Sequence, residues 1–171
     1  MNELASNASL GGIGALMIAA GFILPPAGLM GLALVLMALK RLAALYGEEG
    51  IYKNMLRGLI IVVAGIVFGI VVLFFIVVNV QYRVPSPSLG DILIIIGIPA
   101  VIWLASAIVA NVHYRRALIL LSAKSGNKTF ETAGSLMLAG AVLAFVVVGL
   151  LLIPIAWLLA AMAFFSIKDQ R

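Results

Sequence analysis

Long uncharged runs, separated by short charged segments, dominate the chain. The first run, residues 10–39, contains no charged residue but is interrupted by Pro25 and Pro26. A straight helix over this run would be about 45 Å long, well beyond the roughly 30 Å hydrocarbon core of a bilayer. Paired prolines remove two backbone donors and clash with the preceding turn. The run therefore predicts a tight helical hairpin, with one helix ending near Leu24 and the next beginning near Ala27.

The middle of the chain predicts two longer helices. Residues 58–80 form a continuous apolar span whose start extends back to Ile51. Ser88 and Asp91 have the spacing of a capping box ahead of the next apolar run. Residues 91–124 are then predicted to form one helix that is longer than the membrane is thick.

The last apolar run, residues 132–167, is again too long for one crossing. Gly149 and Pro154 are its candidate helix breakers, so we expect a turn between them. The pattern predicts an all-α fold, a polytopic membrane helix bundle with about six transmembrane segments in three helical hairpins. One domain covers residues 1–171. Because the first helix is short, about 22 Å, the alternative is four full spans with short or re-entrant terminal hairpins.

Charge gives these hairpins an orientation. With the N-terminus inside, ten of the eleven Lys and Arg residues fall on the same side as both termini, and Arg83 alone faces out. Cytoplasmic loops are enriched in Lys and Arg. We therefore expect both termini in the cytoplasm and a multi-pass location in the cytoplasmic (cell) membrane. The opening MNELASNASL lacks the basic start of a cleaved signal peptide, so the first segment is expected to remain in the mature protein.

Composition supports a membrane protein. The chain is 65% hydrophobic and 10% charged, with a mean hydropathy of +1.27, whereas ordinary globular domains are about 45–50% apolar and about 25% charged. So few charges could not cover the surface of a water-soluble protein of this size. The absence of cysteine excludes disulfides, thiolate metal sites and cysteine catalysis.

The two ends of the chain resemble each other. SNASLGGIGALMIAAG, which begins at Ser6, aligns with GNKTFETAGSLMLAGA, which begins at Gly126. We interpret both as helix starts with a polar cap followed by small residues. The alignment predicts internal repeats over 6–46 and 126–167, with a weaker middle copy over 51–125. All copies run in the same direction, unlike the inverted repeats of many transporters. Low-complexity membrane sequence can also align in this way by chance.

The apolar runs contain essentially none of the ionisable groups that catalysis or transport within a membrane usually needs. The single histidine, His113, lies in NVHYRR, where a predicted helix leaves the membrane, and we interpret it as an interfacial residue. No paired carboxylates, metal-ligand spacing or Ser-His-Asp set is evident. The sequence therefore predicts a non-enzymatic protein without a cofactor. The basic residues lie at membrane boundaries, which argues against nucleic-acid binding.

Small residues one helical turn apart are candidate helix-packing positions, because they let two helix backbones approach closely. The candidates are Gly65, Gly69, Gly14, Gly134, Gly140 and Ala144. Packing within one chain is the simpler interpretation, and a dimer seam through the GxxxG motif of Gly65 and Gly69 is the alternative.

Basic residues at the inner boundary are candidate contacts for anionic lipid headgroups. These candidates are Lys40, Arg41, Arg57, Arg115, Arg116 and Lys124. Simple positive-inside orientation explains the same charges without any specific partner.

Three blocks give the chain a resemblance to a known family. They are LASNASLGGIGALM, ALKRLAALYGEEGIYKNMLRG and the closing SGNKTFETAGSLMLAGA…IPIAWLLAAMAFFSI. In these blocks the chain resembles the Domain of Unknown Function nine-ninety-six family, small multi-pass membrane proteins of archaea and some bacteria. The resemblance implies an integral membrane protein and carries no established activity, substrate or catalytic residue.

Two functions follow from these observations. The leading hypothesis is a non-enzymatic scaffold, accessory or self-assembling membrane subunit, acting as a homo-oligomer or within a larger membrane complex. The alternative is a small channel or transporter for an uncharged or lipidic solute. Such a path could use backbone carbonyls near Pro25 and Pro26 and between Gly149 and Pro154, because irregular backbone at membrane depth tends to line cavities.

The predicted orientation can be tested by cysteine labelling, since the chain has no cysteine of its own. In intact cells, a membrane-impermeant maleimide should label Ser86→Cys from outside, because that loop is predicted to be external. It should label Ser125→Cys only after the membrane is permeabilised. The reverse pattern would contradict the orientation.

Overall fold

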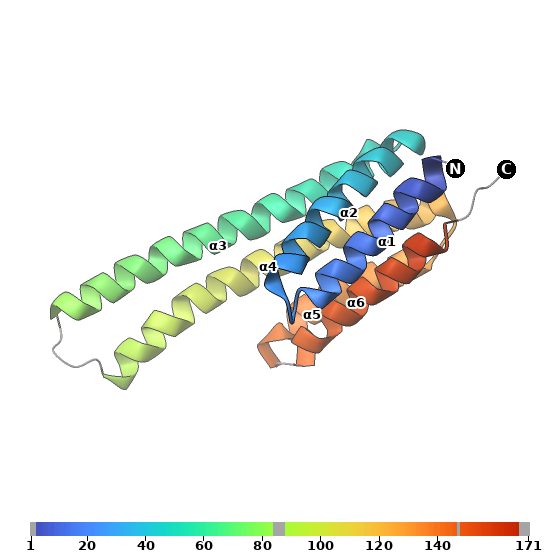
Figure 1. Ribbon diagram of the computed structural model, residues 1–171. Coiled ribbons are helices and arrows are strands. Elements are labelled where there is room, and N and C mark those ends of the chain that lie inside the picture. Colours follow the sequence, from blue (N-terminus) through green and yellow to red (C-terminus); the bar gives the residue numbers. More distant parts are fainter. Residues whose placement is uncertain (1–2, 84–87, 147, 168–171) are drawn as a thin grey trace.

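The computed structural model describes residues 3–83, 88–146 and 148–167 (Figure 1). These residues form six α-helices and one short 3₁₀ turn, and no strand occurs among them. The elements are α1 (Glu3–Ala20), α2 (Pro25–Leu45), α3 (Glu49–Arg83), α4 (Leu89–Ser125), α5 (Thr129–Leu143), η1 (Ala144–Val146) and α6 (Val148–Phe165). The predicted all-helical bundle is confirmed. Ser86, Lys168 and Arg171, which entered the topology argument, lie outside the described residues.

Each helix packs against its neighbours in chain order. α1 pairs with α2, α3 with α4, and α5 with α6. Further contacts of α2 with α3, α4 with α5 and α6 with α1 close the six helices into a ring. Five helical segments are long and apolar enough to cross a membrane: α2, α3, α4, α6, and α5 continued through η1. α1 is not among them, so the predicted count of about six spans is supported only in part.

The hairpins differ greatly in length. α3 and α4 have 35 and 37 residues, about 52 and 55 Å at the rise of an α-helix. The other four helices have 15 to 21 residues, about 22 to 32 Å. The α3–α4 hairpin therefore projects well beyond the α1–α2 and α5–α6 turns (Figure 1). We call this projection, residues 66–83 and 89–105, the outer hairpin, and the part with all six helices the base.

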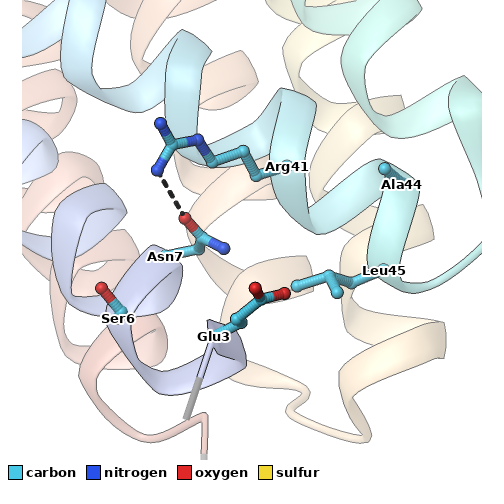
Figure 2. A pocket seen from close by; sticks show the side chains of 6 residues that line it. All are labelled: Glu3, Ser6, Asn7, Arg41, Ala44 and Leu45. Carbon is cyan, nitrogen blue, oxygen red and sulfur yellow. Dashed lines mark hydrogen bonds between the residues drawn. The ribbon is translucent and has the colours of Figure 1, made fainter. Parts of the chain in front are cut away.

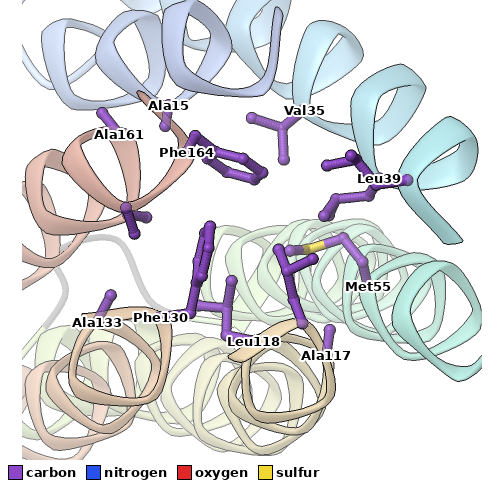
Figure 3. Close-up of a cluster of buried hydrophobic side chains, with 14 of the residues drawn as sticks. Ala15, Val35, Leu39, Met55, Ala117, Leu118, Phe130, Ala133, Ala161 and Phe164 are labelled. Carbon is purple, nitrogen blue, oxygen red and sulfur yellow. The ribbon is translucent and has the colours of Figure 1, made fainter. Parts of the chain in front are cut away.

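Apolar side chains fill the centre of the base. Val35 and Leu39 of α2, Met55 of α3 and Leu118 of α4 are buried there (Figure 3). Phe130 of α5 and Phe164 of α6 meet edge to face, with ring centroids 5.0 Å apart, a favourable aromatic geometry. The ring of helices thus encloses a packed core.

The outer hairpin has almost no core of its own. Among its residues with a described side-chain environment, only Gly69 and Pro99 are buried. Most of the others are large apolar residues, such as Phe74, which is 63% exposed, and Val101, which is 66% exposed. An apolar surface of this extent requires lipid or a partner around it.

Glycines allow the closest approaches between helices. A Cβ atom at Gly31 of α2 would lie 2.5 Å from the carbonyl oxygen of Gly14 and 2.7 Å from the amide nitrogen of Ile18, both on α1. Gly65 and Gly69 face Ser106 and Trp103 of α4. The GxxxG motif therefore lies inside the α3–α4 hairpin, as the simpler interpretation of packing within one chain predicts.

Two predicted helix ends agree with the structure. Ser88 and Asp91 form the capping box at the start of α4, where the Ser88 side chain accepts a hydrogen bond from the Asp91 amide. The Pro25–Pro26 pair opens α2, two residues earlier than predicted. α1 ends at Ala20, four residues before the predicted Leu24.

The predicted turn between Gly149 and Pro154 is wrong. The chain turns earlier, through η1, and both residues lie within α6. Gly149 packs directly on the backbone of Leu143 and Ala144. Because it has no side chain, the turn before α6 can be tight, and Gly149 does not act as a helix breaker. Pro154 lies inside α6, in its second turn, where the missing N–H removes one backbone hydrogen bond but does not end the helix.

The first copy of the repeated phrase is also placed differently from its interpretation as a helix cap. α1 already includes Glu3, so Ser6, Asn7 and Ser9 lie inside the helix. In the second copy α4 ends at Ser125, and the next residue, Gly126, has a left-handed φ of 70°. Asn127 then accepts a hydrogen bond from the amide of Thr129. The polar cap is therefore wrong for the first copy, and the internal repeats stay a prediction.

Substitution of Gly31 should show how much of the stability depends on close helix approach. Gly31→Ala puts a methyl group against backbone atoms that cannot rotate away, so we expect a loss of about 1–3 kcal/mol in the free energy of unfolding. Gly97→Ala is the matched control, because a Cβ atom at Gly97 meets nothing within 4 Å. The free energy of unfolding of both variants is measured by denaturation in mixed micelles of a mild detergent and SDS. Equal stability of the two variants would contradict the packing argument.

Candidate functional site

The structure places the predicted inner basic residues in the base. Lys40 and Arg41 lie in the last turns of α2, Arg57 lies near the start of α3, and Arg115 and Arg116 lie in the C-terminal half of α4. Gly58 packs on Tyr114, so Arg57 and Arg115 lie at a similar height. This height is where charged residues on α3 and α4 give way to the apolar outer part.

Two acidic residues near the α2–α3 loop offset part of this positive charge. Lys124 lies 3.8 Å from Glu48, and Lys53 pairs with Glu49 one helical turn away. Burial raises the pKa of the Tyr46 phenol in the same loop above its ordinary value. No group of three or more His, Cys, Asp or Glu residues that could hold a metal occurs in the part of the chain that the structure describes.

A pocket of about 400 Å³ with several polar residues lies between the N-terminal part of α1 and the C-terminal part of α2 (Figure 2). It is lined by Glu3, Ser6, Asn7, Arg41, Ala44 and Leu45. Nη1 of Arg41 donates to Oδ1 of the buried Asn7 over 3.3 Å. Arg41 was predicted as a lipid contact, whereas Asn7 carried no local signal because its partner is 34 residues away.

A second hollow, of about 390 Å³, lies between α4 and α5, and we call it the α4–α5 groove. It is lined by Arg115, Ser135, Leu138, Ala139, Val142 and Leu143. The half-buried Arg115 donates from Nε to Oγ of Ser135 over 3.2 Å. This bond fixes the guanidinium at one end of an otherwise apolar trough. Since a guanidinium has five N–H donors, four remain without a partner among the described residues.

Gly134 brings the two walls of the α4–α5 groove together. A Cβ atom at Gly134 would lie 3.1 Å from the Cα of Arg115, so only a very small residue allows this approach. The structure therefore brings two predicted site residues, Gly134 and Arg115, into contact. Gly140 instead packs on Gly149 and Ile153 of α6, and Ala144 begins η1.

A third hollow, of about 580 Å³, follows the exposed side of α3, and we call it the α3 groove. It is lined only by apolar residues: Leu59, Ile60, Val63, Ala64, Val67, Phe68 and Val71. No titratable group lines it, so it can only accept apolar groups.

Polar side chains of α3 and α4 form local hydrogen bonds. Nδ1 of His113 lies 3.4 Å from Oδ1 of Asn54, which joins the two helices in the base. Asn79 and Asn111 each donate to the carbonyl oxygen four residues earlier. Their amides are thus satisfied within their own helices.

Comparison with known proteins gives a family and no activity. The pattern of a family described as protein of unknown function (DUF996) matches residues 27–158. An uncharacterised protein of Methanocaldococcus jannaschii is 25% identical over 175 aligned positions, which cover 98% of this chain and 95% of that relative. No solved structure matches.

Proposed function

The chain belongs to this DUF996 family, and we propose that it is a non-enzymatic integral membrane protein that acts as a self-assembling scaffold or accessory subunit. The proposal is supported by the filled core of the base together with the uncovered outer hairpin.

The α3–α4 hairpin has the right apolar length to cross a bilayer. Residues 58–82 and 92–112 carry no charged side chain, and they measure about 37 and 31 Å along their helices. A hydrocarbon core is about 30 Å thick. We therefore propose that its inner boundary lies near Arg57 and Arg115, on the cytoplasmic side because Lys and Arg gather there.

The terminal hairpins then reach only part of the way across. Ser135 of α5 is hydrogen-bonded to Arg115 at the proposed boundary, and α5 ends at Leu143, about 12 Å further along the helix. Half of the hydrocarbon core is about 15 Å. The α1–α2 turn lies at a similar height along α4 (Figure 1). This geometry favours re-entrant terminal hairpins around two complete crossings, in place of six crossings.

Self-association is proposed to use the α3 groove. Ala64 is a small residue between the larger Ile60 and Phe68 on the exposed side of α3, and small residues let a second helix approach closely. Gly65 and Gly69 face α4, so they are not the proposed seam between chains. The packed core offers no support for a solute path through the ring of one chain, which makes a channel or transporter the weaker candidate.

Disulfide crosslinking in proteoliposomes tests this surface. Val67→Cys places a thiol in the α3 groove, on a side chain that is 56% exposed. We expect mild oxidation to give mainly covalent dimers, because the two α3 helices face each other in an assembled pair. Dimer yield on non-reducing gels, measured at increasing lipid-to-protein ratios, is the readout.

Val101→Cys is the matched control, since this α4 residue is also exposed and lies in the outer hairpin. It should crosslink much less and lose its crosslinks on dilution with lipid. Equal yields at both positions would indicate random collision and would rule out the α3 groove as the seam. A chain that stays monomeric and retains one fixed partner protein during purification would show an accessory role without self-assembly.

A further inference from the structure

The three hollows of the base and α3 differ in the ligands that they can accept. The pocket between α1 and α2 offers Arg41, but also the Glu3 carboxylate, which repels an anion. The α3 groove has no charged residue. The α4–α5 groove combines a guanidinium at one end with an apolar trough along the rest of its length.

This combination matches an anionic phospholipid in both charge and shape. Arginine donates several parallel hydrogen bonds to phosphate, and the bond to Ser135 holds the Arg115 guanidinium at the mouth of the trough. Leu138, Ala139 and Val142 continue along one side of α5. From Ser135 to Leu143 the trough extends about 12 Å, close to the depth of one leaflet's hydrocarbon, about 15 Å.

We propose that the α4–α5 groove binds one anionic phospholipid, with its phosphate on Arg115 and one chain along Leu138, Ala139 and Val142. The direction of the trough rests on the membrane placement proposed above, in which Arg115 marks the cytoplasmic boundary. The exposed Arg116 next to it does not line the groove. The site therefore requires Arg115 specifically, and a general positive charge on this face is insufficient.

Native mass spectrometry of the full chain in detergent tests the site. The probes are phosphatidylglycerol and phosphatidylcholine with identical chains, and sn-glycerol 3-phosphate as the headgroup without chains. We expect the chain to retain one phosphatidylglycerol in preference to phosphatidylcholine. Arg115→Gln should weaken this retention about tenfold, as expected for the loss of charge-assisted hydrogen bonds.

Two further variants separate binding in the groove from general electrostatic attraction and from binding of phosphate alone. Arg116→Gln removes the same charge outside the groove and should retain the lipid as the parent chain does. Val142→Trp fills the trough without changing charge and should lose the lipid. Size-exclusion profile and helix content, unchanged in all three variants, show that they remain folded.

Three results would overturn the proposal. Equal loss in Arg115→Gln and Arg116→Gln would show diffuse electrostatic attraction. Retention by Val142→Trp, with equal binding of glycerol phosphate, would show a phosphate site without a lipid chain. Equal retention of phosphatidylglycerol and phosphatidylcholine would show that the net charge of the headgroup does not contribute to binding. Because one solubilised chain is measured, none of these results depends on self-assembly or on the number of crossings.

Discussion

Close approach between helix backbones is the constraint on which this structure depends. Lipid is as apolar as the helices themselves, so helices in a bilayer associate through tight packing and gain little from burying apolar surface. Glycine contacts the neighbouring helix at five of the six seams of the ring, and α2 with α3 is the exception. At four of these seams the glycine meets backbone atoms, whereas at the α1–α6 seam Gly11 and Gly12 make room for the rings of Phe164 and Phe165. The glycines that contact the neighbouring helix at these seams are Gly11, Gly12, Gly14, Gly31, Gly50, Gly58, Gly65, Gly69, Gly134, Gly140 and Gly149.

Sequence reasoning succeeded where the signal is local. The Pro25–Pro26 pair and the capping box of Ser88 each act within one turn of the chain, and each lies at or near the helix start that was expected. It failed at Gly149 because the same residue type serves two purposes. A glycine can end a helix, or it can let a neighbouring backbone approach closely. Which of these Gly149 does depends on its contacts with α5, and the local sequence pattern contains no information about those contacts.

The heights of the helices and the groove could not be predicted for a related reason. Hydropathy identifies apolar runs, but the offset between α5 and α4 is set by the approach of Gly134 to Arg115. In the proposed placement, that offset decides how deeply the terminal hairpins reach into the bilayer. The same offset places Arg115, which was predicted only as a basic residue at the membrane boundary, at one end of the α4–α5 groove beside Ser135. The sequence around Ser135 has no feature that would have singled it out. Arg115 was predictable as a basic residue, whereas its partners were not.

The unequal hairpins give the molecule a wedge shape, with six helix cross-sections at one end and two at the other. In the proposed placement, the cytoplasmic leaflet accommodates about three times the helix area of the outer leaflet, since α-helices have similar diameters. A molecule of this shape fits best in a curved membrane in which the leaflet that contains the base is the outer, more expanded leaflet. The protein should therefore enrich in small vesicles with its base outward, and even distribution over vesicle radius would contradict this consequence.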